Sequence, residues 1–324
     1  MGAMNAGRIF AALVLCALVL SVTVERSACG QGGATPPEVT GQGLEAVLFA
    51  QEPMIQQPIG AAVDGRGRLL VIESHTHFRP KDWQGPENDQ VVALVDDNGD
   101  DRADRREVFF DGTQFTMDIA MGADGWVYLA TRNEILRVRD RDGDGRAEEV
   151  ERKLIQVQTE GTYPHNGLSG LAFDGKGGFY FGMGENLGFA YTIQGADGVS
   201  YSDQAEGGNV WHARLDGKNL RRIATGFWNR FGVCVDPAGE VFATDNDPGE
   251  RPPCRLIHVV NGGDYGFQFR YGRGGTHPFV SWDGRRPGTL PPITGVGEPP
   301  CDLLCYRPKA SPIYLGLGPH MQPQ

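Results

Sequence analysis

Four copies of one pattern recur along the chain at intervals of 50–62 residues. Each copy has a short apolar run, a turn of the type D-x-x-G or G-x-D-G, and a second apolar run. The copies are IGAAVDGRGRLLVIES (59–74), DIAMGADGWVYLAT (118–131), LSGLAFDGKGGFYFGMG (168–184) and FGVCVDPAGEVFATDN (231–246). Alternating apolar residues around a Gly-containing turn are typical of a hairpin, so each copy predicts two antiparallel strands.

Further strand candidates lie between the copies, at 90–96, 134–140, 209–215 and 254–260. They bring each unit to about four strands, which is the content of a propeller blade. No long stretch keeps the 3.6-residue period of a helix. The sequence therefore predicts an all-β fold, a β-propeller of four-stranded blades, of which about four are visible.

The N-terminal residues predict export. An apolar run at 9–22 follows the single basic residue Arg8; it is short for a membrane span of ~20 residues but suits a signal peptide. Small residues allow cleavage after Gly30, and lipid modification of Cys29 is the alternative. A periplasmic or cell-envelope protein, with no transmembrane span in its mature chain, follows. The predicted division is a signal peptide at 1–30, a linker at 31–44, propeller blades at 45–270 and, at 271–324, a Pro/Gly-rich connection that begins a further blade of a truncated propeller.

The net charge bears on nucleic-acid binding, and the cysteine content bears on disulfide bonds. The formal net charge is −11, and binding to nucleic acid requires neutralisation of phosphates, so a nucleic-acid partner is not expected. In an exported chain, four cysteines outside the signal region predict disulfides. Pairing of Cys234 with Cys254 and of Cys301 with Cys305 is one of three arrangements, and a zinc site is the alternative.

Two acidic hairpin loops match the D-x-[DN]-x-[DN]-G-x5-E calcium pattern, at 96–107 and 140–151. Calcium takes six to eight oxygen ligands, which converge only where the loop turns sharply. The second loop matches fully, whereas the first has Asp101 at the glycine position. The alternative is a pair of solvated hairpin tips. The predicted metal ligands are Asp96, Asn98, Asp100, Glu107, Asp140, Asp142, Asp144 and Glu151.

Histidines give the candidates for catalysis. His165 lies in a Gly-rich stretch just before a predicted innermost strand, so its side chain is expected near the propeller axis, where an imidazole can take a proton from a hydroxyl. A turn-capping or solvent-facing histidine is the alternative. Strand alternation places His75 and His77 on one side with Glu73, which predicts either a metal site or surface histidines.

The stretch around 165–185 resembles the motif of the soluble quinoprotein glucose/sorbosone dehydrogenases: a His, small residues, two strands around a Gly/Asp turn, and G-x-G-[DE]. The stretch GFWNRFGVCVDPAGEVFATDNDPGERPPCRLIHVVNGGDYGF (226–267) is similar to a second run of that family. The likeness extends to the planctomycete-type "membrane-bound dehydrogenase" propellers, which are often followed by a haem-binding cytochrome domain.

This resemblance implies six blades that bind pyrroloquinoline quinone (PQQ) beside Ca²⁺, a sugar or related alcohol as substrate, and a cytochrome as electron acceptor. It further implies His165 as catalytic base and Asn229 as a cofactor contact. The motif's arginine is Trp228 here, and Arg230 lies two residues on. Arg230 is therefore either a displaced cofactor contact or the ion-pair partner of an acid after the next strand, Asp245 or Asp247.

Two other function classes stay open. One is a catalytically silent, calcium-binding propeller that serves as a binding or docking module. The other is a hydrolase propeller of the lactonase type, with a central metal held by Glu, Asn and Asp side chains.

Overall fold

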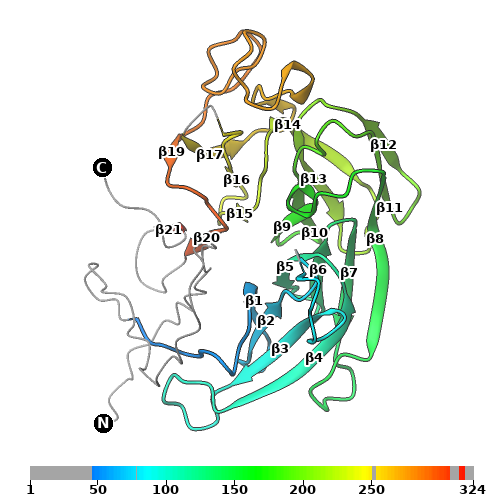
Figure 1. Cartoon of the computed structure of the whole chain (residues 1–324), viewed down its shortest axis with the longest axis vertical. Helices are drawn as coiled ribbons and strands as arrows, with labels where there is room; N and C mark the ends of the chain where they lie inside the picture. Colours follow the sequence, from blue (N-terminus) through cyan, green and yellow to red (C-terminus); the bar gives the residue numbers. More distant parts are fainter. Residues whose placement is uncertain (1–45, 78, 250–252, 307–313, 318–324) are drawn as a thin grey trace.

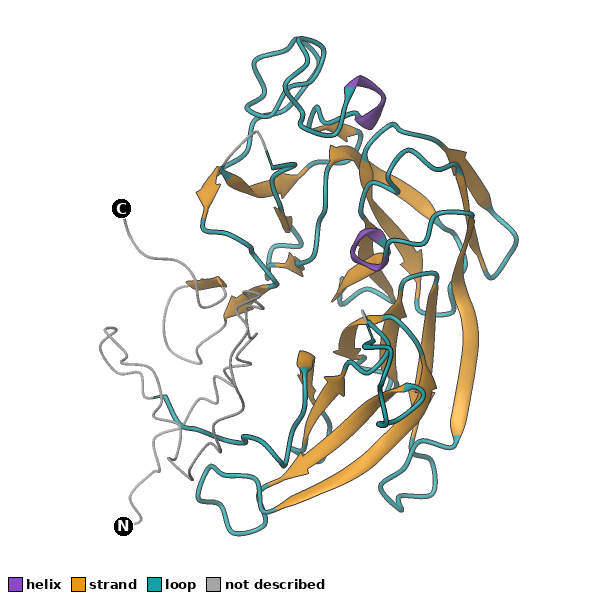
Figure 2. Ribbon diagram, in the orientation of Figure 1, coloured by secondary structure: helices purple, strands orange, loops and turns teal. Residues whose placement is uncertain are grey.

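A computed structural model describes residues 46–77, 79–249, 253–306 and 314–317. The predicted signal peptide and linker lie outside these residues. The described chain consists of strands and loops, with two single-turn 3-10 helices, η1 (Pro164–Asn166) and η2 (Phe269–Tyr271) (Figure 2). No helix in these ranges has the length and apolar character that a membrane span requires.

Five sheets begin one after another along the described chain, with some later strands returning to an earlier sheet, and antiparallel pairing dominates them. The first contains β1 (Pro58–Val63), β2 (Leu69–Glu73), β3 (Asp89–Val95) and β4 (Arg105–Thr113). The second contains β5 (Thr116–Met121), β6 (Val127–Thr131), β7 (Glu134–Arg139), β8 (Glu149–Thr159), β11 (Tyr191–Gly195) and β12 (Ser200–Asp203). The third contains β9 (Leu168–Phe173), β10 (Gly178–Met183), β13 (Gly208–Arg214), β14 (Arg221–Phe227) and β18 (Gly263–Asp264).

The fourth sheet contains β15 (Val233–Val235), β16 (Val241–Asp245), β17 (Cys254–Val259) and β19 (Thr294–Val296), and the fifth pairs β20 (Leu303–Tyr306) with β21 (Tyr314–Leu317). The first strand of each sheet contacts the first strand of the next, in the series β1, β5, β9, β15 and β20. The sheets therefore stand as blades in an arc, with these five strands on its inner side (Figure 1). The prediction of an all-β propeller fold is confirmed.

The recurring aspartate explains why the inner hairpins form. Asp64, Asp124, Asp174 and Asp236 each lie in the turn between the first two strands of a sheet. Asp174 accepts hydrogen bonds from the amides of Lys176 and Gly178, and Asp64 and Asp236 make the same two contacts two and four residues further on. Each carboxylate thus satisfies turn amides that the strand ladder cannot reach.

The remaining predicted strands are also present, as β3, β7, β13 and β17. Apolar cores fill the space between neighbouring sheets. Tyr128 from the second sheet packs with Phe179 from the third, and Ala172 from the third packs with Val241 and Ile257 from the fourth. Strand β19 lies beyond residue 270 and still completes the fourth sheet.

The cysteines correct one prediction. No disulfide joins Cys234, Cys254, Cys301 or Cys305 in the described structure. Cys234 and Cys305 instead pack in an apolar cluster between the fourth and fifth sheets. Because this cluster buries the thiol of Cys234 as a small apolar group, the fold does not depend on the predicted bridges.

One buried ion pair joins the fourth sheet to the loops around it. Asp245, at the end of β16, lies 2.6 Å from Nη2 of Arg255 on β17, and both side chains are essentially inaccessible to solvent. Arg255 also donates to the carbonyls of Tyr265, Trp282 and Gly226. Its guanidinium lies 3.5 Å from the centre of the Trp282 ring.

Replacing Arg255 by Met should lower the free energy of unfolding by about 3–5 kcal/mol, because Asp245 is left as an uncompensated buried charge. Urea denaturation measures this change. The control is Arg139→Met, which breaks the partly exposed pair with Glu149 and should cost less than about 1 kcal/mol. Equal losses for the two variants would contradict the expectation.

Candidate functional site

His165 lies in the turn η1, which connects the second sheet to the innermost strand of the third. The turn is held by Arg132, the residue after β6. Its Nε donates to the Tyr163 carbonyl at 3.1 Å, and its own carbonyl accepts the Leu168 amide at 3.2 Å. Gly167 is required at the close approach, since a Cβ there would meet the Arg132 backbone at 2.5 Å. The His165 ring is half-buried beside Tyr163, with 5.1 Å between ring centres.

The segment from Asn229 to Phe231 lies beside this turn. Ser169 donates to the Arg230 carbonyl at 2.9 Å, and the Phe231 ring lies 6.3 Å from that of His165. A Cβ on Gly184 would lie 3.0 Å from both Asn229 Oδ1 and the Cα of Asn166, the neighbour of His165. The structure thus brings Asn229 close to the turn that carries His165, whereas the Arg230 guanidinium lies inside the third sheet, against Gly170 and Gly182.

Asn229 owes its position to the buried ion pair. Asp245 accepts hydrogen bonds from the Trp228 and Asn229 amides, and Asn229 forms an isolated β-bridge with Asn246. The Oδ1 atom of Asn229 is buried and has no hydrogen-bond partner among the described residues. A buried acceptor of this kind is costly unless a donor reaches it.

Arg230 is fully buried between the two inner strands of the third sheet and the loop before β15. Its guanidinium occupies the space above Gly182, where a Cβ would collide with it, and Nη1 would lie 2.7 Å from a Cβ on Gly170. Asp245 pairs with Arg255, and no ion pair of Arg230 is found in the described part of the chain. Nε and Nη1 of Arg230 have no partner within the same ranges.

Trp228, at the position of the family motif's arginine, lies beside the cation of Arg273, whose guanidinium carbon is 5.5 Å from the centre of its ring. Its ring is buried in an apolar cluster, 5.3 Å from the Phe267 ring and stacked parallel to Phe269. Trp228 therefore serves packing.

Burial sets the protonation of the site. It lowers the pKa of the His165 imidazole below its ordinary value, which keeps the ring neutral at pH 7. Burial also raises the pKa of the Glu185 carboxyl, whose two oxygens accept the amides of Gly188 and Gly207.

A second pair of acids lies at the inner strands. Asp118 on β5 accepts the Leu171 amide, and Asp302 accepts the Leu303 amide at the start of β20. Burial removes water from the Asp118 carboxyl and raises its pKa, and repulsion from the Asp302 carboxylate raises it further.

The two acidic loops share one conformation. Asp96 accepts the amides of Gly99 and Asp101, and Asp140 accepts those of Gly143 and Gly145 at the same two offsets. Asn98 and Asp142 accept the amide two residues on, as do Asp100 and Asp144. Asp101 adopts the left-handed backbone that Gly145 adopts in the other loop, with φ of 66° and 101°. The missing glycine therefore does not prevent the turn.

The loops are closed by their ninth residues and not by their twelfth. Asp104 accepts the Asp97 amide, and Glu148 accepts the Arg141 amide. Ligand oxygens of Asp140, Asp142 and Glu148 lie within 4.8 Å of one another. Glu148 therefore stands where Glu151 was expected.

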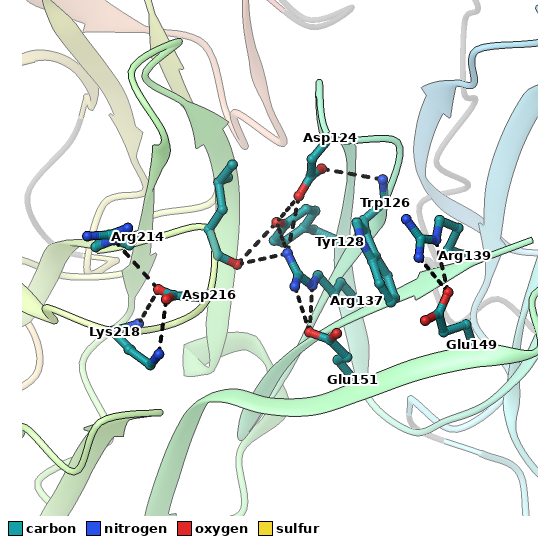
Figure 3. A network of polar contacts seen from close by, with 11 residues as sticks. Asp124, Trp126, Tyr128, Arg137, Arg139, Glu149, Glu151, Arg214, Asp216 and Lys218 are labelled. Atoms are coloured by element: carbon teal, nitrogen blue, oxygen red, sulfur yellow. Dashed lines mark hydrogen bonds and ion pairs between the residues drawn. The ribbon is translucent and has the colours of Figure 1, made fainter. Parts of the chain in front are cut away.

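The twelfth residues lie on the following strands, where arginines engage them. Glu107 pairs with Arg105. Glu151 lies 2.7 Å from Arg137, whose Nη1 also reaches Asp124 and the Leu215 carbonyl of the third sheet (Figure 3). In the described structure both glutamates engage arginines, and their role as loop ligands stays a prediction.

Glu73, His75 and His77, predicted to lie on one side of the chain, do not form a single group. Glu73 and His75 are buried, with 3.5 Å between Oε2 and Nε2, and Arg106 pairs with Glu73. His77 instead stacks on His165, with 4.5 Å between ring centres and 10° between ring planes. The surface interpretation is thus wrong for His75. Arg132 and the position of His77 were missed by sequence reasoning, since no local pattern connects either residue to His165.

The residues present fit a polar, anionic quinone. Arg230 offers two guanidinium nitrogens, Nε and Nη1, that have no partner among the described residues, and Asn229 offers a buried amide oxygen that requires a donor such as a ring N–H. His165 supplies a neutral imidazole on the turn beside Asn229. PQQ carries carboxylates and carbonyls, which a guanidinium recognises.

Comparison with known proteins shows a common fold. The aldose sugar dehydrogenase of Streptomyces coelicolor, in its PQQ-bound form, is 16% identical with a TM-score of 0.55, over 83% of this chain and 76% of that one. The aldose sugar dehydrogenase of Escherichia coli, in its apo form, is 14% identical with a TM-score of 0.52, over 82% and 81%. A glucose dehydrogenase is 17% identical with a TM-score of 0.59, over 84% and 83%. At such identity the likeness concerns the fold. No curated protein matches by sequence, and the profile described as Domain of unknown function (DUF7133) matches residues 39–264.

Replacing Arg132 by Met should loosen the turn that carries His165, because the Tyr163 carbonyl loses its donor. We expect faster hydrogen exchange in a peptide covering 161–168 and a loss of about 1–3 kcal/mol in the free energy of unfolding. Arg152→Met, at an exposed pair with Glu134, is the matched control. Unchanged exchange at 161–168 would show that Arg132 does not hold the turn.

Proposed function

Because the chain belongs to the family described as Domain of unknown function (DUF7133), whose member here has the fold of sugar dehydrogenases, we propose that it is a quinoprotein-type dehydrogenase. It oxidises a sugar or related alcohol with PQQ, and calcium supports the fold. The observation that supports the proposal is the half-buried His165 on a turn beside Asn229, whose buried Oδ1 has no partner among the described residues.

His165 acts as the base. Its Nδ1 lies 3.4 Å from the Tyr163 hydroxyl. In the tautomer whose Nδ1–H donates to that hydroxyl, Nε2 carries the lone pair and accepts the proton of a substrate hydroxyl. PQQ, when bound, supplies the acceptor for the hydride equivalent. Asn229 and Arg230 would hold it through hydrogen bonds and opposite charge.

The remaining parts of the proposal concern the setting of the enzyme. The N-terminal apolar run favours export to the periplasm or cell envelope, and a cytochrome serves as electron acceptor. The planctomycete-type resemblance motivates that acceptor, together with further blades beyond this chain. The division into signal peptide, linker, blades and a connection after residue 270 belongs to the same proposal.

Titration of the full chain with PQQ, with and without Ca²⁺, tests the proposal. We expect calcium-dependent binding with a Kd on the order of micromolar, weakened in Asn229→Ala, and sugar-dependent dye reduction. His165→Ala should lower kcat/KM by about 10²–10⁴-fold. Because protonated His165 cannot act as a base, kcat/KM should fall with falling pH only below the ordinary histidine pKa of about 6.5.

A second candidate function rests on the enclosure of Arg230. A guanidinium buried over Gly182 supports a structural role as well as a cofactor contact, and Trp228 is used in packing. A calcium-binding propeller that serves as a docking module would then bind Ca²⁺ without PQQ. That result in the same titration would overturn the dehydrogenase proposal.

Calcium binding by the second loop has its own test. Glu148→Gln should weaken Ca²⁺ binding by at least about tenfold, or about 1.4 kcal/mol, because a ligand carboxylate is lost. Glu151→Gln should leave the affinity unchanged, since Arg137 holds that side chain. Calorimetric titration of both variants decides between the ninth and twelfth residues as ligands. A larger loss in Glu151→Gln would restore the loop pattern read from the sequence.

A further inference from the structure

The buried carboxylate of Asp89 holds the loop that places His77 beside His165. Asp89, at the start of β3, accepts hydrogen bonds from the amides of His75 and Thr76 and from the Thr76 hydroxyl, at 2.7–2.8 Å. Its other oxygen accepts the amide and hydroxyl of Thr116 on β5, at 2.8 and 2.9 Å. The loop after β2 is therefore fastened to the inner strand of the next sheet, and the backbone entering His77 has little freedom.

The two imidazoles come from distant parts of the fold. His77 extends from the first sheet and His165 precedes the third, yet their rings stack with 4.5 Å between centres and 10° between planes. Tyr163 and Phe231 border the His165 ring at 5.1 and 6.3 Å. His77 thus covers one face of the imidazole and leaves its edge to other groups.

We propose that His77 is a positioning residue for the base at His165: it covers one ring face, fixes the ring plane and keeps water from that face. The proposal rests on the proposed function for its consequence in catalysis. The stack itself is a property of the chain alone.

The electrostatics favour an uncharged His77 imidazole over the His165 ring. Burial and the proximity of His165 lower the pKa of His77 to about 4, against the raising effect of Asp89. Among the described residues, Tyr163 contacts His165 through its hydroxyl, Arg132 binds the Tyr163 carbonyl, and the bordering Phe231 is uncharged. Two parallel imidazoles at this distance repel each other when both are protonated, which favours a neutral His77 beside His165.

NMR titration of the full chain with isotope-labelled histidines, in the absence of PQQ, tests the proposal. His165 is assigned by its loss in His165→Gln. In His77→Ala the His165 midpoint should rise toward 6.5, because one face becomes hydrated. In His77→Phe, which keeps a flat ring in place, the midpoint should stay low. His277→Ala, which removes a histidine stacked on Tyr271, is the matched control and should leave His165 unchanged.

An unchanged His165 midpoint in His77→Ala would overturn the proposal, as would an equal rise in His77→Phe and His77→Ala. If His77→Ala does not fold, His77→Asn replaces it as the variant that removes the ring. Failure of the wild-type chain to bind PQQ would remove the proposed function but would not alter this titration. Where the enzyme is active, His77→Ala should shift the acid limb of kcat/KM by the same amount as the NMR midpoint and change kcat little above both midpoints.

Discussion

The geometry of the candidate site depends on the buried pair of Asp245 and Arg255. A carboxylate without access to water needs a partner, and Arg255 supplies one at 2.6 Å. The remaining capacity of Asp245 goes to the backbone amides of Trp228 and Asn229. The ion pair that neutralises the buried carboxylate of Asp245 therefore also fixes the segment that lies beside His165.

The site draws on four sheets, and each contributes through a different kind of force. The first sheet contributes His77, whose loop is held by the hydrogen bonds of Asp89. The second sheet contributes Arg132, whose guanidinium holds the turn before β9. His165 lies in the turn η1, just before the innermost strand of the third sheet, and the fourth sheet supplies Asp245 to anchor Asn229. A site of this kind exists only when the blades are packed together.

Local patterns predicted the local parts of this structure. The turn aspartates gave the inner hairpins, because a carboxylate that caps turn amides leaves a regular sequence mark. The acidic loops are predicted for the same reason, whereas the contacts of Asp104 and Glu148 with loop amides are not, because the strands begin before the twelfth residue of each loop. The expected disulfides are absent among the described cysteines. His77 and Arg132 reach His165 only through the arrangement of the blades, which no spacing in the sequence encodes.

Arg230 and Gly182 share one volume. The guanidinium lies where the Cβ of any other residue would stand at position 182, so a side chain there requires the Arg230 guanidinium to move. The absence of a side chain on β10 is therefore what allows this cation its present place inside the third sheet.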